Sequence, residues 1–269
     1  MKIKLFYHGN CPDGFGSAWA FYQKYKDSID YEKFFYGKKI NASKHDLIYF
    51  ADCSVPLSKL NELRESCDVI IIDHHKTAID ELKDDPDFYY NINHSGCVLS
   101  WKFLFPNKPI PTLLKYIEDR DLWNWNLKNS QEILSYLDSF DFCFDAWSEI
   151  NNDLSDQIGT NRIVEIGSSI LRYKEKLVKI FSRNTNEIKI RGYNGSIINA
   201  PFFQGEIADC FEDKDFVIVF YKLKSHYKCS IRTRQDNVDV SLIAKHFGGG
   251  GHKKAAGFLI EDLSELNNI

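Results

Sequence analysis

The chain lacks several features that would assign it to a specialised class of protein. Its seven cysteines are an odd number and include no C-x-x-C pair, which indicates neither a disulfide framework nor a zinc ribbon. No segment approaches the roughly 18 consecutive apolar residues that a membrane helix requires. Residues 1–7 are strand-like and soon give way to polar residues, so they lack the apolar middle of a signal peptide. These absences predict a cytoplasmic, reducing location and no membrane partner.

Excess charge is absent as well. The 269 residues carry a net charge of -4, so the chain as a whole does not resemble a nucleic-acid coat, and a polyanion would need a local basic patch. Hydrophobic residues make up 43% and charged residues 27% of the sequence, as in an ordinary globular protein. Internal repeats and low-complexity segments are missing too, and the length predicts one or two domains.

The first half alternates short apolar strands with helical stretches. Strands are predicted at residues 3–7, 46–50 and 69–72, and helices at 16–25 and 57–66. Alternation at this spacing is typical of strand–helix–strand units that build a parallel sheet. The sequence therefore predicts an α/β fold with an N-terminal parallel sheet.

The pattern changes near residue 185. Residues 130–183 are mainly helical, and apolar residues at close to helical period predict a helix over 161–181. Strand-like segments follow at residues 188–190, 196–198, 216–223, 227–232 and 256–260. We therefore predict three parts: a domain at residues 1–160, a helical connector at 161–185, and a smaller mixed α/β domain at 186–269.

Asp73, His74 and His75 directly follow the apolar, β-branched run at residues 69–72. Such a run is typical of a strand buried on both faces, and it delivers the next residues to the carboxyl edge of the sheet, where ligands bind in open α/β folds. One carboxylate and two imidazoles in a row suit a divalent metal and an anionic substrate. The alternative, on these residues alone, is a helix-capping aspartate followed by two surface histidines.

Three further segments carry acidic residues or histidine. Together with Asp73-His74-His75 they make four segments, and all four are expected to follow strand-like runs. The three further segments are residues 7–17, which include His8, Cys11 and Asp13, then Asp52, and residues 118–123, which include Asp119 and Asp121. Because strand ends converge at one edge of a parallel sheet, carboxylates gathered there would repel one another unless a cation lay between them. Asp and His ligands without paired thiolates suit Mn²⁺, Mg²⁺ or Fe²⁺. Taken singly, these residues also fit a turn, a helix cap or a solvated surface.

The C-terminal part carries a second signal. Four glycines, Gly248 to Gly251, precede His252 and two lysines, and a glycine run exposes backbone N–H groups and allows phosphate to approach closely. Between Lys222 and Lys254 there are eight Lys or Arg and two Asp, a local charge of +6. Candidates for stacking on a nucleobase are Tyr227, Phe247 and Phe258. This segment is the predicted contact for a nucleotide.

Taken in order, these motifs resemble those of the DHH-family phosphoesterases. Asp73-His74-His75 matches the motif that names the family, and Ser230-Ile231-Arg232 with Gly248-Gly249-Gly250-Gly251-His252 resembles its associated C-terminal domain. The resemblance covers nearly the whole chain and is nearest in form to small oligoribonuclease-type members, the nano-RNases. It implies a catalytic metal-binding domain at residues 1–160 and a substrate-binding domain at 186–269.

The resemblance also implies a two-metal site, usually with manganese, and with Mg²⁺ or Fe²⁺ as alternatives. The implied metal ligands are His8, Asp13, the bridging Asp52, His74, and either Asp121 or Asp119, of which Asp121 is preferred for its Asp-x-Trp context. In the catalytic group, His75 would face the scissile phosphate and Asp73 would orient a histidine. The substrate's phosphate and terminal nucleotide would be held by Ser230, Arg232, Gly249, Gly250, Gly251 and His252.

One position departs from the family pattern. Cys11 stands where the family usually has an aspartate, two residues before Asp13, with Asn10 beside it. A thiolate or an amide would then replace a carboxylate among the ligands of the first metal. We expect either that the site accepts this change with a softer metal preference or a weaker affinity, or that it holds one metal strongly and one loosely.

The implied activity is metal-dependent hydrolysis of a phosphodiester in short single-stranded RNA or DNA, or in a small nucleotide, as by an exonuclease or oligoribonuclease. Two alternatives stay open. One is hydrolysis of a cyclic dinucleotide or a 3'-phosphonucleotide, and the other is a nucleotide-binding regulatory module that has lost catalysis through the change at Cys11. A homodimer is also left open.

Overall fold

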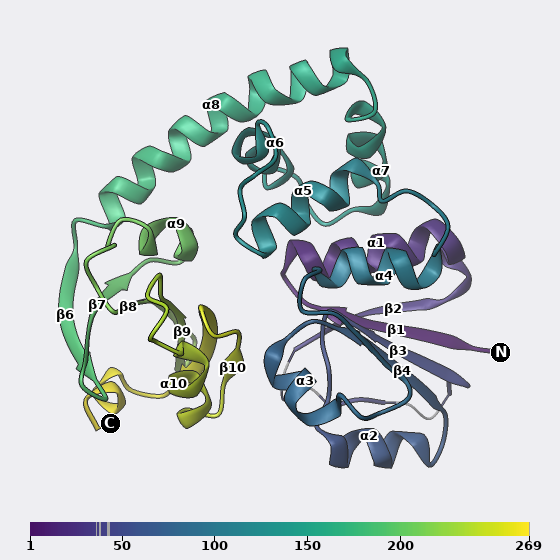
Figure 1. Ribbon diagram of the computed structural model, residues 1–269, viewed down its shortest axis with the longest axis horizontal. Helices are drawn as coiled ribbons and strands as arrows, with labels where there is room; N and C mark the ends of the chain where they lie inside the picture. The colour runs from purple at the N-terminus through teal and green to yellow at the C-terminus, as the bar shows by residue number, and fades with distance from the viewer. Residues whose placement is uncertain (36, 38, 42–43, 269) are drawn as a thin grey trace. The chain divides into compact units, whose positions relative to one another are not determined.

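The computed structural model of the protein describes residues 1–35, 37, 39–41 and 44–268. The chain divides into two compact units, Met1–Leu171 and Arg172–Ile269 (Figure 1). The border between the units lies within the 25-residue helix α8 (Gln157–Phe181). The functional division into residues 1–160, 161–185 and 186–269 stays a prediction.

The first unit is built on a five-stranded sheet in the order β2-β1-β3-β4-β5. Its strands are β1 (Ile3–His8), β2 (Asp30–Phe34), β3 (Leu47–Ala51), β4 (Asp68–Asp73) and β5 (Phe88–Tyr90). All neighbours pair in parallel, which confirms the predicted parallel sheet. The chain adds β2 on one side of β1 and β3 on the other, so the strand order reverses between β1 and β3. In open sheets, ligands bind beyond the carboxyl ends of the strands at such a reversal.

Helices cover both faces of this sheet (Figure 1). One face carries α1 (Pro12–Tyr25) and α4 (Gly96–Leu104), and its core extends to α5 (Thr112–Asp121), α6 (Ser130–Leu137) and α7 (Phe144–Asp153). The other face carries α2 (Leu57–Arg64) and α3 (Lys76–Leu82). Strand β3, in the middle of the sheet, is buried at every residue, which is why its apolar residues run without alternation.

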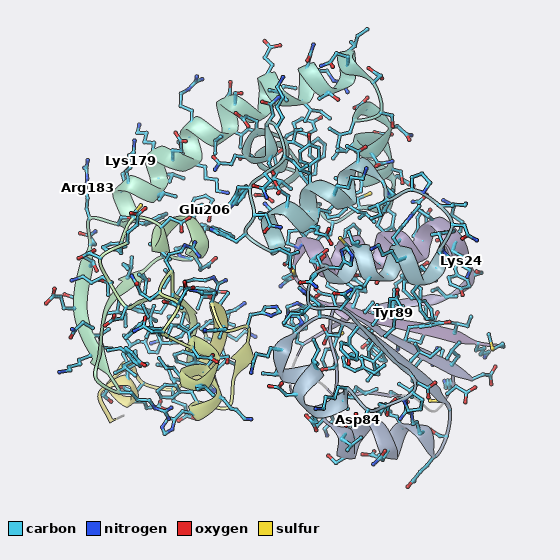
Figure 2. The ribbon with its side chains drawn as sticks, in the orientation of Figure 1. Lys24, Asp84, Tyr89, Lys179, Arg183 and Glu206 are labelled. Carbon is cyan, nitrogen blue, oxygen red and sulfur yellow. The ribbon has the colours of Figure 1, made fainter. Side chains whose placement is uncertain are left out.

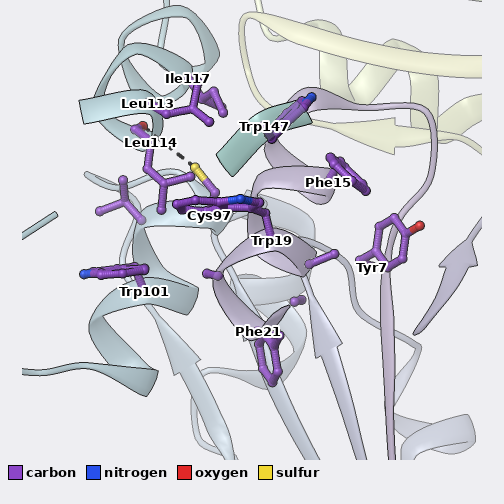
Figure 3. Close-up of a cluster of buried hydrophobic side chains, with 14 of the residues drawn as sticks. Tyr7, Phe15, Trp19, Phe21, Cys97, Trp101, Leu113, Leu114, Ile117 and Trp147 are labelled. Carbon is purple, nitrogen blue, oxygen red and sulfur yellow. Dashed lines mark hydrogen bonds between the residues drawn. The ribbon is translucent and has the colours of Figure 1, made fainter. Parts of the chain in front are cut away.

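The core between the sheet and helices α1 and α4 is rich in aromatic residues. Trp19 of α1 stacks on Trp101 of α4 with a ring-centroid distance of 6.1 Å (Figure 3). Burial of a side chain such as Phe15, which is 3% exposed, stabilises the fold by roughly 1.5–3 kcal/mol. Gly16 lets the two helices approach closely, because a Cβ atom there would lie 2.9 Å from Cβ of Cys97. This packing fixes the start of α1 beside the start of α4.

The second unit holds a mixed sheet in the order β10-β11-β9-β8-β7-β6. Its elements are β6 (Thr185–Ile190), β7 (Tyr193–Asn199), α9 (Gln204–Ala208), β8 (Phe216–Leu223), β9 (His226–Arg232), α10 (Val240–His246), β10 (Gly250–Gly251), β11 (Ala255–Ile260) and a 3₁₀ helix (Leu263–Asn268). β7 and β8 pair in parallel through a crossover that contains α9, and the other neighbours are antiparallel. The predicted mixed α/β unit is confirmed, although α9 and α10 were not predicted.

The C-terminal half of α8 packs within the second unit. Lys174 of α8 forms an ion pair with Glu206 of α9. Figure 2 shows Glu206 on α9, with Lys179 near the end of α8 and Arg183 just after it. Among the described residues, no helix has the length and apolar character needed to cross a membrane.

Candidate metal centre

Three neighbouring strands of the first unit end in ionisable residues. His8 is the last residue of β1, Asp52 directly follows β3, and Asp73 is the last residue of β4. Because β1 pairs with β3 and β3 pairs with β4, these residues meet at the carboxyl edge of the sheet. They lie beside the point where the strand order reverses, as the argument from strand ends predicted.

Asp52 lies at the centre of this group. Its side chain is 1% exposed, with Oδ2 3.4 Å from Nδ1 of His8 and Oδ1 3.3 Å from Nε2 of His74. Ordinary N–H···O hydrogen bonds measure about 2.7–3.2 Å, and neither oxygen of Asp52 accepts one from the described residues. The backbone of Asp52 is also strained, with a φ of 56° in the left-handed region that residues other than glycine adopt infrequently. A buried, strained carboxylate without hydrogen bonds is typical of a functional group.

Gly96, which the sequence analysis did not single out, makes room for Asp52. A Cβ atom at residue 96 would lie 2.5 Å from Cβ and 2.8 Å from Oδ1 of Asp52. Gly96 is the first residue of α4. The available sequence signal was the Ser-Gly pair at residues 95–96, where a glycine opens an apolar helix and allows another group to approach its backbone.

Asp13 binds the N-terminus of α4. It lies in the first turn of α1, which begins at Pro12 and not at the expected residue 16, because proline is favoured at the first helical position. Its carboxylate accepts hydrogen bonds from the backbone N–H groups of Gly96 at 2.6 Å and Cys97 at 2.9 Å. The positive end of the α4 dipole therefore stabilises this carboxylate. Oδ2 of Asp13 also lies 3.5 Å from Nε2 of His74, which connects both helices to the centre.

The aspartate of the Asp-His-His motif orients the second histidine. Asp73 is fully buried, and its Oδ1 accepts hydrogen bonds from the backbone N–H groups of His74 at 2.8 Å and His75 at 3.2 Å. The same oxygen lies 2.7 Å from Nδ1 of His75. The ring of His75 is therefore held with Nδ1 toward Asp73, and Nε2 lies on the other side of the ring.

The fourth acidic segment ends a helix, which corrects the expectation that all four segments follow strands. Residues 112–121 form α5, because their apolar residues recur at helical spacing. Oδ2 of Asp121 lies 3.5 Å from Nε2 of His74, and the side chain of Asp121 is 26% exposed. Asp119 instead accepts hydrogen bonds from the backbone N–H groups of Asn126 at 2.8 Å and Leu127 at 3.2 Å. The structure thus brings Asp121, and not Asp119, to the group around His74.

The donor atoms at this edge of the sheet form clusters whose members lie within 4.8 Å of one another. One cluster contains His8, Cys11 and Asp52, a second contains Asp13, His74 and Asp121, and a third contains Asp52, Asp73 and His75. Imidazole nitrogen with carboxylate oxygen is a donor set that divalent transition metals use, and a thiolate adds a softer ligand.

Crowding of charge shifts the pKa values in this centre. Burial, together with the charge of Asp52, raises the pKa of Asp13 well above its usual range. Burial alone would lower the pKa of His8, but interactions with Asp52 and Cys11 raise it to about 11. Burial would raise the pKa of Asp52, but interactions with His74 and His8 hold it well below its usual range. Bound protons thus offset the gathered carboxylates here, which a divalent cation also does, and the residues present fit such a cation.

The predicted substrate-binding residues of the second unit lie side by side on its sheet. Gly250 of β10 pairs with Gly257 of β11, and Gly257 pairs with Ser230 of β9. Side chains of directly paired residues share one face of a sheet, so the two glycines leave the surface beside Ser230 without side chains. Two residues along β9, Arg232 donates a hydrogen bond to the carbonyl oxygen of Ala256 at 3.3 Å.

Backbone N–H groups in and next to the glycine run form hydrogen bonds within the fold, which was not expected. The N–H groups of Gly248 and Gly249 donate to carbonyls of the last turn of α10 at 3.1 and 2.9 Å, and the N–H group of His252 donates to Ala255 at 2.8 Å. These three N–H groups are not offered to a phosphate, which corrects the expectation that the run exposes them. Gly249 is required for close packing instead, because a Cβ atom there would lie 2.1 Å from the carbonyl oxygen of Gly257.

Comparison with known proteins matches a family model to the C-terminal part of the chain and relatives to most of its length. The model of the DHHA1 domain matches residues 205–269. An uncharacterized protein of Acanthamoeba polyphaga mimivirus is 32% identical over an alignment of 290 positions, which covers 96% of this chain and 68% of that protein. Oligoribonuclease NrnB of Bacillus subtilis is 22% identical over an alignment of 268 positions, which covers 86% of this chain and 63% of that protein. The chain spans about two thirds of the length of these relatives.

Solved structures share the fold at low identity. The pGpG-specific phosphodiesterase PggH of Vibrio cholerae matches with a TM-score of 0.51 and 12% identity, covering 98% of this chain and 95% of that one. RecJ of Thermus thermophilus, in complex with Mn²⁺, matches with a TM-score of 0.53 and 15% identity, covering 99% of this chain and 50% of that one. These matches extend the likeness in fold across both units.

Proposed function

The chain belongs to the DHH phosphoesterase family, and from this premise we propose that it is a metal-dependent phosphodiesterase of short oligonucleotides or small nucleotide phosphoesters. The observation that carries the proposal is the buried carboxylate of Asp52, which has imidazoles on two sides and accepts no hydrogen bond from the described residues. The activity named for the Bacillus relative supports an oligonucleotide as the substrate.

Two divalent ions would be held by the clusters around Asp52. His8, Cys11 and Asp52 would bind one ion, and Asp13, His74 and Asp121 would bind the other. We infer Mn²⁺, the ion in the structure of RecJ, with Mg²⁺ or Fe²⁺ as alternatives. When bound, such ions supply Lewis-acid charge that activates water and neutralises phosphoryl oxygens.

His75 would contact the reacting phosphate. Asp73 holds Nδ1 of its ring at 2.7 Å, so the ring is already oriented before substrate arrives. We assign Nε2 of His75 to stabilising the negative charge that develops on the phosphoryl oxygens, a role that a fixed donor performs without reorganisation. Asp73 would act as the residue that orients this imidazole.

The second unit would hold the rest of the substrate. Ser230 and Arg232 would contact phosphate beside the strip left open by the paired glycines. Gly249, Gly250, Gly251 and His252 would border the terminal nucleotide. If the unit holds one end of a short single strand, cleavage would remove nucleotides from that end, which is the reaction of an exonuclease. A cytoplasmic location belongs to the same proposal.

Asp52→Asn tests the proposal, because asparagine has the same shape and tolerates the positive φ of residue 52. Asp84→Asn, an exposed change between α3 and β5 (Figure 2), is the matched control. With Mn²⁺ and a 5'-labelled RNA dinucleotide to pentanucleotide series, Asp52→Asn should lose about 10²–10³-fold in rate, and Asp84→Asn should lose none. An unchanged rate in Asp52→Asn would overturn the proposed centre.

A substrate panel identifies the substrate class. Short RNA, short DNA, a linear and a cyclic diguanylate, and 3'-phosphoadenosine phosphate would be incubated with wild-type protein and Mn²⁺, and the products separated. Preferential cleavage of short linear strands supports the proposal, and clean hydrolysis of the cyclic or 3'-phosphorylated compound alone replaces it with that alternative. Binding without turnover across the whole panel would identify a regulatory module.

A further inference from the structure

The two metal clusters differ in chemical softness. His8, Cys11 and Asp52 include one sulfur atom, whereas Asp13, His74 and Asp121 offer only oxygen and nitrogen. Asp52 faces both sets, with Oδ2 3.4 Å from Nδ1 of His8 and Oδ1 3.3 Å from Nε2 of His74. One carboxylate thus lies between a set with a thiol and a set without one.

The backbone fixes Cys11 beside this carboxylate. Cys11 is the N-cap residue of α1 in an extended conformation, and Pro12 follows it as the first helical residue. The carbonyl oxygen of Cys11 accepts the N–H of Phe15 at 2.9 Å. On the other side, Asn10 turns the chain with a φ of 57° between β1 and α1. With both neighbours constrained, the side chain of Cys11 stays within 4.8 Å of His8 and Asp52.

The carboxylate of Asp52 is the second, independent sign of a ligand. It is 1% exposed and accepts no hydrogen bond of ordinary geometry from the part of the chain that the structure describes. Burying an ionised carboxylate costs several kcal/mol unless a partner compensates it. A neutral thiol adds no compensating charge, whereas a cation shared by the sulfur, the imidazole and the carboxylate would take over the role of the bound protons.

We propose that Cys11 makes the first metal site selective for a borderline ion such as Zn²⁺ or Fe²⁺ over Mn²⁺ and Mg²⁺, so that the centre holds two different metals. This inference rests on the proposed function for the second, hard ion at Asp13, His74 and Asp121. Thiolate and imidazole ligands prefer zinc and iron, whereas carboxylate and water suit manganese and magnesium. On binding, the thiol of Cys11 releases its proton to solvent as the sulfur–metal bond forms.

Cobalt reports a sulfur ligand directly and needs no turnover. Chelator-stripped full-length protein would be titrated with Co²⁺, and the near-ultraviolet charge-transfer band from sulfur to cobalt recorded. We expect the band in wild type and in Cys143→Ser, which changes an exposed cysteine of the same unit, and we expect its loss in Cys11→Ser. Competition with Zn²⁺ and Fe²⁺ identifies which ion displaces cobalt.

Cys11→Asp gives the complementary result. A carboxylate in place of the thiolate should lower the ratio of Zn²⁺ to Mn²⁺ affinity by at least about tenfold, since changes outside the first ligands already cost 10–100-fold. Wild-type protein provides a check that needs no variant, because Zn²⁺ should protect Cys11 from iodoacetamide. The exposed Cys143 and Cys210 are internal references that should react equally with and without the ion.

The outcomes separate this inference from the proposed function. A cobalt spectrum that is the same in wild type and Cys11→Ser, or alkylation of Cys11 that Zn²⁺ does not slow, would overturn the role of Cys11 even if the enzyme cleaves oligonucleotides. A band that depends on Cys11, in a protein that hydrolyses no member of the substrate panel, would uphold the mixed site and reject the phosphodiesterase.

Discussion

Replacing Gly96 with alanine tests whether the start of α4 and the carboxylate of Asp52 are packed as tightly as the structure shows. The new Cβ atom would lie 2.5 Å from Cβ of Asp52, which is about 1 Å inside ordinary carbon–carbon contact. Asp52 cannot yield easily, because it is buried and its backbone is already strained. If α4 yields instead, it stretches the hydrogen bonds of 2.6 and 2.9 Å to Asp13.

The size of the effect follows from these two routes. Overpacking costs about 1–3 kcal/mol, and weakening a hydrogen bond to a charged group costs about 1.5–3 kcal/mol. Alanine offsets about 0.4–1 kcal/mol by restricting the unfolded chain. A net loss of about 1–3 kcal/mol lowers the melting temperature by about 2–4 °C for each kcal/mol in a chain of this size. Strain that reaches Asp52 also weakens Mn²⁺ binding, by about tenfold for each 1.4 kcal/mol.

Urea unfolding and calorimetric Mn²⁺ titration measure the two effects. Gly257→Ala is the matched control, because a Cβ atom there would meet only one carbonyl oxygen at 3.4 Å, an ordinary contact. It should leave Mn²⁺ affinity unchanged and alter the unfolding free energy far less than Gly96→Ala. Equal stability and equal Mn²⁺ affinity in Gly96→Ala and wild type would refute the packing argument.

Three further predictions follow from individual contacts. Asp119→Asn should cost about 1–3 kcal/mol of stability, because its hydrogen bonds to the following loop weaken, and it should leave Mn²⁺ affinity unchanged. Asp121→Asn should weaken Mn²⁺ binding and leave stability equal or higher. The opposite pattern in thermal-unfolding and Mn²⁺-binding assays would exchange the roles of the two residues. Mn²⁺ at 100 times its Kd should stabilise the protein by about 2.7 kcal/mol, and a melting temperature insensitive to Mn²⁺ and chelator would argue against a metal centre. Arg64 donates hydrogen bonds to Asp85, one of them 2.8 Å long, and these lower the pKa of Asp85 in the folded state. The pair therefore stabilises the fold fully above the pKa of Asp85 in the unfolded chain, about 3.9. This stabilisation is lost as the pH falls through the lower pKa of Asp85 in the folded state. Arg64→Ala should therefore cost about 1–3 kcal/mol at pH 7 and less below about pH 4, and a cost independent of pH in urea titrations would contradict this assignment.

The sequence was sufficient for the central strands of the first unit and insufficient for its edges. β1, β3 and β4 are runs of apolar residues that no helix or turn explains as well, and all three were predicted. β2 and β5 were missed, since β2 is an edge strand with charged residues and a single buried residue, and β5 has only three residues. Short edge strands take their conformation from pairing with a neighbour, which local sequence does not encode.

The candidate centre divides in the same way. Residues at strand ends were predictable because parallel strands bring their carboxyl ends together, whatever their separation in the chain. Asp121 was found through the motif of the family and not through its local structure, which is helical. Gly96 was missed because its importance lies in a contact with Asp52, a residue on another element, and sequence spacing carries no record of such a contact. The glycine run was recognised, but its hydrogen bonds to α10 depend on tertiary packing.

The bonds between Asp13 and the start of α4 also have a consequence for the order in which the protein matures. These bonds join residues 83 and 84 positions apart, and Asp121 lies still further along the chain. During synthesis, a nascent chain from which only the first four strands have emerged already contains a histidine and carboxylates of the centre. It still lacks α4, the helix that restrains Asp13. Closing so long a loop is slow compared with forming local structure. We therefore expect the centre to bind metal late, after most of the first unit has folded, so that the ions do not direct its folding.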